Sequence, residues 1–373
     1  MASSTINIGV KVNFGGVTSA INQVSTSLNR IAPSARTAQA GLIGMSTGSN
    51  RLTRSLQTVI AQFIGLQAAL RTLSFGVNQI IAFEKSMAEV KAITQKATGD
   101  NEFARTFNQM SETARKFGAI TVFSAAEAAQ GLKFLAMAGF SAQQSMNSLG
   151  ATLRLAQAGS MDLGDAADKM TNIMTAFGLT ANDSNNVVDN LTTIAASSNT
   201  SVAQLAEAMK YAGSAASALG LDMEQSAAAI GTLANAGMQA SLGGTGLRQV
   251  LVKLSTQTGA MKTIMADLGI TTEDVSLKTN TLAEVVRTFA DSGVTAGQVM
   301  EGFGARAGAA FLNLLGGIDT LESLTAAQED NAGSAKRMAD TMDDTIAGSI
   351  KRLQSAFTEL MLSQEGFASM LRN

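Results

Sequence analysis

The chain has 373 residues, 46% of them hydrophobic, and a formal net charge of −2, so it can bury a sizeable core but carries no global basic field for specific nucleic-acid recognition. It contains no Cys and no His, which excludes disulfides, thiolate catalysis and imidazole bases and fits a reducing cytoplasm. One Pro, one Tyr, no Trp and 19 Met predict an all-α fold with small-residue packing.

The first 50 residues show two different periodicities. Apolar and polar residues alternate from Ile6 to Phe14, which predicts one short, half-buried strand. Apolar residues then recur at steps of four and three from Val17 to Ile31, which predicts a coiled-coil-like helix that ends before Pro33. Residues 33–50 are rich in Gly, Ser, Ala and Thr. We therefore expect residues 1–50 to form a strand, a helix and a flexible joint.

The most regular pattern is a heptad seam in residues 51–82. Its apolar residues step by four and three over about four heptads, and the flanking positions carry no charge that would select a partner. The seam predicts a long coiled-coil-like helix that packs against other helices, including those of further copies of the chain. The predicted oligomerisation seam consists of Leu52, Leu56, Val59, Phe63, Leu66, Leu70, Leu73, Val77 and Ile80.

From residue 83 onward a short phrase recurs, in which Gly is followed by an apolar residue and then by Ser, Thr or Asp. In such a phrase the glycine ends one helix in a left-handed conformation, and the polar side chain caps the next helix. The phrase predicts helical hairpins over residues 83–330, followed by a C-terminal helix in residues 331–373 that spans Ser334 to Leu362. The predicted turn glycines are Gly139, Gly178, Gly220 and Gly269.

Two further helix starts are marked by capping boxes. Ser124 precedes Glu127 by three residues, and Ser201 precedes Gln204 by the same spacing. In each pair the hydroxyl and the longer side chain satisfy backbone amides at the beginning of a helix. Both pairs therefore support the prediction of packed helices.

The stretch AGMQASLGGTGLR, residues 236–248, contains four glycines and raises the question of phosphate binding. Five residues separate Gly237 from Gly243 and no lysine follows, so the spacing and the cation of a phosphate-binding P-loop are both missing. The sequence before the stretch is typical of a helix, whereas a dinucleotide site needs a strand there. We predict instead a strained hairpin turn in which Gly243, Gly244 or Gly246 has a positive φ, with Thr245 capping the helix that follows.

Paired carboxylates occur at three places, and two facing carboxylates can act as a general acid and a general base. Such chemistry needs two carboxylates facing each other across a cleft, whereas each of these pairs lies in a helix start or a charged surface context. Their spacing does not match a calcium loop either. We therefore predict no catalytic, cofactor-binding or metal site and no enzyme activity. The pairs are Asp162 with Asp165, Glu273 with Asp274, and Asp343 with Asp344.

Five segments, in this order along the chain, resemble the core of tail tape measure proteins of long-tailed bacteriophages and their prophage relatives. The resemblance covers roughly residues 83–362, and it is specific because several motifs agree in sequence order. The segments are FEKSMAEVKAIT (83–94), VFSAAEAAQGLKFLAMAGF (122–140), MTAFGL (174–179), GTGLRQVLVKLS (244–255) and FGARAGAAFLNLL (303–315).

The resemblance implies a structural protein of the virion tail lumen, made in the host cytoplasm. Members of the family lie in several copies inside the tail tube, set its length during assembly, and leave ahead of the DNA at infection. The implied partners are further copies of the chain, the tail tube protein, baseplate or tail tip proteins and tail assembly chaperones, with the host inner membrane as a further contact.

The length of the chain departs from the family pattern. At about 1.5 Å per residue, a single helix of this length could not exceed roughly 560 Å, and most family members are much longer. The resemblance therefore leads us to expect either a short-tail variant or the N-terminal portion of a longer tape measure.

An alternative function rests on the stretch from Val59 to Phe83. It carries one formal charge, Arg71, and is long enough to cross a bilayer as a helix. This alternative is a membrane-active protein whose apolar helix forms or aids a channel for DNA through the host inner membrane. Gln62 and Gln67 interrupt the stretch, and the heptad seam accounts for its apolar residues without lipid, so we favour protein packing.

Overall fold

The structure is a computed structural model that describes residues 78–95, 100–257 and 259–345, together with residues 348, 350, 351 and 354. Within these ranges every regular element is a helix, which confirms the predicted all-α class. Residues 78–94 form one helix, and the labelled helices belong to a compact unit, Ser86–Arg352. The predicted strand and the helix predicted over residues 17–31 lie outside the described residues.

Most helices of this unit form two rows, because successive helices alternate between one row and the other. Within each row every helix packs on the next helix of that row. Row A consists of α4 (Ala125–Met137), α6 (Leu163–Ala176), α8 (Val202–Ala218), α10 (Ala240–Thr256) and α13 (Ala296–Gly316). Row B consists of α5 (Ala142–Ala158), α7 (Ser184–Ser197), α9 (Met223–Asn235) and α14 (Ile318–Ala326).

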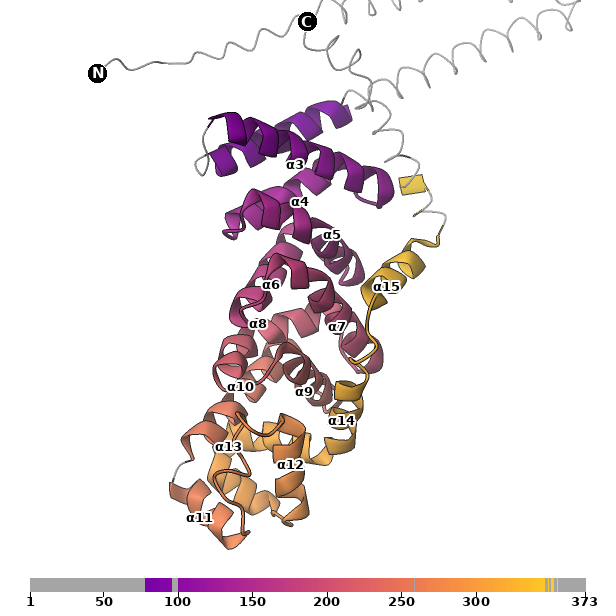
Figure 1. Cartoon of the computed structure of the whole chain (residues 1–373). Coiled ribbons are helices and arrows are strands. Elements are labelled where there is room, and N and C mark those ends of the chain that lie inside the picture. Colours follow the sequence, from indigo (N-terminus) through magenta and orange to yellow (C-terminus); the bar gives the residue numbers. More distant parts are fainter. Residues whose placement is uncertain are drawn as a thin grey trace, which may run out of the picture. The chain divides into compact units, whose positions relative to one another are not determined.

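Four further helices complete the unit. Helix α3 (Asp100–Ile120) packs on α4 and α5, while α11 (Gly259–Asp267) and α12 (Leu282–Asp291) pack on α13. Helix α15 (Ser334–Asp343) turns back along row B and packs on α7 and α5 (Figure 1, yellow). A short 3-10 turn, η2 (Ala181–Asp183), precedes α7. The core is thus a series of helical hairpins with one returning helix at its side.

The hairpin turns have a common hydrogen-bond pattern. After α4, the amide of Gly139 donates to the carbonyl of Ala136 (3.0 Å), and the amide of Phe140 donates to the carbonyl of Leu135 (3.1 Å). These two bonds define a Schellman motif, which places the residue after the helix in the left-handed region. The four glycines predicted at turns all have positive φ, with values of 95° at Gly139, 66° at Gly178, 101° at Gly220 and 70° at Gly269.

The same pair of bonds occurs at two turns that the recurring phrase does not identify. Gly237 has a φ of 86° and ends α9, while Ser160 ends α5 with a φ of 47°. Ser160 shows that the motif tolerates a residue with a side chain, although at a cost in backbone strain. A sequence search restricted to glycine therefore misses turns of this kind.

N-cap side chains form hydrogen bonds at the starts of six labelled α-helices, namely α4, α5, α8, α9, α12 and α13. The capping boxes of Ser124 with Glu127 and of Ser201 with Gln204 are both present and are confirmed. After Gly220, Asp222 caps α9 by accepting a bond from the amide of Gln225 (2.7 Å). Each cap satisfies amides that have no partner inside the helix.

Two predicted elements differ from the structure. Thr271, which follows Gly269, does not cap a helix; it forms hydrogen bonds with Asp274, and turns continue to the start of α12. The C-terminal helix begins at Ser334 as predicted, but α15 ends at Asp343 instead of continuing toward Leu362. After α15 residues 344 and 345 are non-helical, whereas the described residues 348, 350, 351 and 354 are helical again, so the predicted helix is interrupted at this point.

Candidate functional site

The predicted oligomerisation seam lies almost entirely outside the described residues. Of its nine residues only Ile80 is described, and it is buried within the helix of residues 78–94. The seam, its role in assembly and the boundary at residue 82 therefore stay predictions.

The stretch AGMQASLGGTGLR contains a turn, but the prediction that Gly243, Gly244 or Gly246 forms it was wrong. Gly243 and Gly244 lie inside helix α10, and neither they nor Gly246 has a positive φ. The turn is six residues earlier than Gly243, at Gly237, and the N-cap of α10 is Gln239, not Thr245. The amides of this region bond within a helix instead of forming a loop around an anion.

These helical glycines permit backbones to approach closely. A Cβ atom at Gly244 would lie 2.2 Å from the carbonyl oxygen of Ala208 in α8, and one at Gly243 would lie 2.4 Å from the carbonyl oxygen of Met238. A Cβ at Gly246 would lie 3.1 Å from the Cβ of Ala310 in α13. Because the neighbour of Gly244 is a backbone atom of α8, a side chain there would force α8 and α10 apart, whereas one at Gly243 would collide with the turn before α10. The glycines thus set the distance between neighbouring helices of row A.

Helix α13, which packs on α10, contains a kink. Gly304 has a φ of 77° and a ψ of 168°, which only glycine adopts without strain. The kink brings Phe303 and Phe311 into a stacked pair with ring centroids 4.1 Å apart, and Phe289 of α12 meets Phe311 edge-on at 5.1 Å. All three rings are fully buried. The segment FGARAGAAFLNLL therefore forms a bent helix that is stabilised by packing of aromatic rings.

One carboxylate of each pair has a structural partner. Asp165 forms an ion pair with Lys169 of the same helix, and Lys169 also pairs with Glu207 of α8 at 3.3 Å. Lys169 is buried, so these two acids compensate its charge and join α6 to α8. Asp343 accepts a hydrogen bond from Gln157 of α5. Within the described ranges, no three His, Cys, Asp or Glu side chains are grouped so that they could hold a metal ion.

Exposed acids in the turns act as caps. Hydrogen bonds from the side chain and backbone of Thr271 lower the pKa of Asp274, and bonds from the backbone and side chain of Thr281 lower the pKa of Glu284. In each case the ionised carboxylate is the form that accepts these bonds, which is the reason for the direction of the shift. These acids therefore have a local structural function.

A polar network that the sequence did not predict holds α15 on row B. Asp189 of α7 accepts hydrogen bonds from the amides of Gly333 (2.8 Å) and Ala335 (2.9 Å). The hydroxyl of Ser334 donates to the carbonyl of Asp189 (2.7 Å). The carboxylate thereby caps the first turn of a helix that is 144 residues away from it in the chain.

The network continues into the buried interior of the unit. The amide side chain of Asn331 donates to Asn190, whose own side-chain amide donates to Glu224 of α9 (2.9 Å). Gln328 donates to the backbone carbonyl of Glu224 (2.9 Å). Residues from α7, α9 and the α14–α15 connection thus form one hydrogen-bonded group.

Four of the five segments that carry the family resemblance lie on row A. Residues 122–140 include α4 and its turn, residues 174–179 include the end of α6, and residues 244–255 lie in α10. Residues 303–315 form the kinked part of α13. These four segments all belong to row A, and the last two are on helices in direct contact. Row A therefore contains four of the five motifs and also the close backbone contact between α8 and α10.

Comparison with known proteins gives matches over the same region. A family model described as phage-related minor tail protein matches residues 111–296. The tape measure protein of Pneumococcus phage Dp-1 is 34% identical over 289 residues, which cover 75% of this chain and 24% of that protein. The probable tape measure protein of Escherichia phage P2 is 28% identical over 298 residues, which cover 76% of this chain and 36% of that protein. No solved structure matches the chain.

The matched region begins within α3 and ends at the start of α13. This match places the chain in the class of phage-related minor tail proteins. Within that class the chain belongs to the phage tape measure family, as its five motifs predict. The chain spans 24% and 36% of the lengths of these two relatives.

The membrane alternative concerns a segment that is largely outside the structure. Among the described residues, no helix has the length and apolar character needed to span a bilayer. The apolar stretch of residues 59–83 is described only from residue 78 onward.

Proposed function

We propose that this chain acts as the core region of a tape measure protein in the lumen of a phage tail tube. In this role it sets tail length during assembly and is released at infection. The observation that carries the proposal is the similarity to two tape measure proteins across the helices of both rows. The chain then acts through its length and shape, and its function requires no catalytic step or cofactor.

The proposed partners follow from this location. Further copies of the chain would associate through the seam of residues 51–82, because its apolar positions repeat with a coiled-coil period. The tail tube protein would surround the chain, and baseplate or tail tip proteins would contact its end. Tail assembly chaperones would bind the chain in the host cytoplasm before the tube closes. The host inner membrane would be a contact only during genome ejection.

The first test is the presence of the chain in assembled tails. Tails purified from the phage that encodes the chain should contain it in several copies, measured by quantitative mass spectrometry against the tube protein. Immunolabelling of the N-terminus should locate it at one end of the tail. Absence of the chain from assembled tails would contradict the proposed location.

A second test addresses length control directly. An insertion of about 28 residues that continues the heptads within residues 51–82 should lengthen the tail by about 42 Å, because an α-helix rises about 1.5 Å per residue. Tail lengths would be measured by electron microscopy. The matched control places an insertion of the same size in the turns of residues 271–280, and it should leave tail length unchanged. Equal tail lengths in the two variants would rule out a ruler function for residues 51–82.

A further inference from the structure

Helix α15 differs from the two rows in how it is attached. Only Ala335 and Ala339 of its ten residues are buried, whereas ten of the thirteen residues of α9 are buried. Met338 is partly buried against the core, and the hydrogen bonds at the first turn of α15 depend on Asp189. A helix held in this way loses little apolar burial when it leaves.

The second observation is the groove beside α15. A space of 450 Å³ opens between α7 and α15, and its lining includes Ala196, Met338 and Met342. Met342 is 42% exposed, so the apolar side chains on this side of α15 do not complete a sealed contact. Water therefore reaches the boundary between the two helices, which weakens their association.

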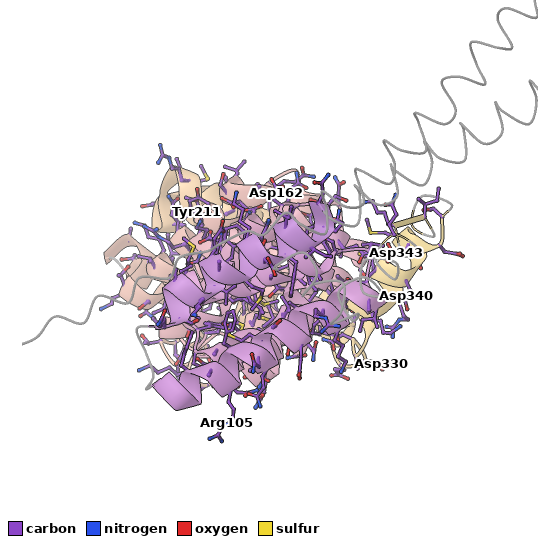
Figure 2. The ribbon with its side chains drawn as sticks, turned by 90° about the horizontal axis from the view of Figure 1, so that it is seen from above. Arg105, Asp162, Tyr211, Asp330, Asp340 and Asp343 are labelled. Atoms are coloured by element: carbon purple, nitrogen blue, oxygen red, sulfur yellow. The ribbon has the colours of Figure 1, made fainter. Side chains whose placement is uncertain are left out.

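The third observation is the direction in which α15 takes the chain. Helix α14 packs on α9, and α15 then runs back past α7 to α5, where Gln157 donates to the backbone of Ala339 (3.1 Å) and to Asp343. Figure 2 labels Asp340 and Asp343 on this helix, at one side of the unit. While α15 is docked, its last residues therefore lie beside α5. If α15 were released, α14 would be the last labelled helix packed on row B.

We propose that α15 is a releasable strap, which detaches from α5 and α7 as a unit while the two rows stay folded. Its release moves the last attachment of a labelled helix to row B from α15 back to α14. Three features make this release possible: a polar cap, two small buried side chains and an open groove. The proposal does not depend on the tail function.

The absence of cysteine from the chain allows a direct test by thiol labelling. Ala339→Cys places a single thiol beneath the strap, and Ala228→Cys places one in α9, where the side chain is fully buried. In the full chain without denaturant, Ellman's reagent should modify the thiol at position 339 at least about 100-fold faster than the thiol at position 228. Equal protection of the two thiols would overturn the proposal.

A second variant tests the role of the cap. Asp189→Asn keeps the size of the side chain but removes the charge that binds the amides of Gly333 and Ala335, so it should accelerate labelling at position 339 about 10-fold and leave position 228 unchanged. Equal acceleration of both thiols would show that the strap and the rows open together, and the proposal would fail. Ala335→Cys, also fully buried in the strap, repeats the measurement in case Cys at position 339 disturbs docking. Circular dichroism would verify that every variant retains its helices.

Discussion

The α8–α10 crossing and the attachment of α15 are two opposite ways of joining helices in one chain. At the crossing, Gly244 meets the backbone of Ala208 without any side chain between them, and Leu247 and Leu251 are fully buried beside it. At α15, a carboxylate and several amides make the contact, and two alanines supply the buried apolar surface. Close packing joins the first pair, and hydrogen bonding joins the second.

This difference indicates which helices unfold together and which open separately. Burial of apolar surface is lost only when a helix leaves completely, so helices joined by close packing unfold together. Hydrogen bonds at a wet surface are exchanged for bonds to water at small net cost, so a helix joined by them opens locally. The two rows should therefore behave as one cooperative unit and α15 as a separate, weaker one.

The largest effect is expected from Gly244→Ala. The added methyl group would lie 2.2 Å from the carbonyl oxygen of Ala208, and because that atom belongs to the backbone, α8 and α10 must separate. We expect the free energy of unfolding to fall by about 3 kcal/mol, measured by urea denaturation. Gly316→Ala is the matched control, since a Cβ there has open space, and it should not destabilise the chain. A similar result for both variants would contradict the account of the crossing.

A smaller and local effect is expected from Ala339→Glu, which places a charge beneath α15. The free energy of unfolding of the rows should change by less than about 1 kcal/mol, because α15 contributes little to their packing. Trypsin cleavage after Lys336 or Arg337 should become about 10-fold faster, while cleavage after Arg248 in α10 should not change. If cleavage in α10 accelerated equally, α15 would be part of the cooperative core.

The smallest effect concerns a capping carboxylate. Hydrogen bonds from Thr281 lower the pKa of Glu284 below its ordinary value of 4.5. Its contribution to stability is therefore present above pH 4.5 and disappears as the pH falls through the lowered pKa. Glu284→Gln does not titrate, so its urea midpoint should fall slightly less than that of the wild type between about pH 6 and about pH 3. An identical fall in both proteins would show that the cap does not contribute.

Local chemistry made much of the fold predictable from the sequence. The turn at Gly139 depends on residues within one helical turn, and so do the capping boxes at Ser124 and Ser201. Helix ends of this kind are recognisable because their partners are close in the chain. The family could also be recognised, because its motifs are continuous segments in a fixed order.

The remaining features depend on partners that are distant in the chain. Glycine is typical of turns, but Gly244 lies in a helix and permits close contact with the backbone of Ala208. The sequence alone does not show that these two residues are neighbours. Asp189 lies inside α7 and caps a helix whose first residue is Ser334. Both roles arise from tertiary packing, and neither leaves a periodic signal along the chain. Glycine in particular has two uses, positive φ and close contact, which the sequence does not distinguish.

Native-state hydrogen exchange in increasing urea tests the central contrast between packed rows and a strap most directly. Amides of Leu247 and Leu251 in α10 should exchange only through global unfolding, so their exchange should accelerate steeply with urea. The amide of Ala339 in α15 should exchange faster and depend little on urea at low concentrations, because its local opening exposes little surface. If the amide of Ala339 instead showed the same protection and the same urea dependence as those of α10, the account of two differently joined regions would be contradicted.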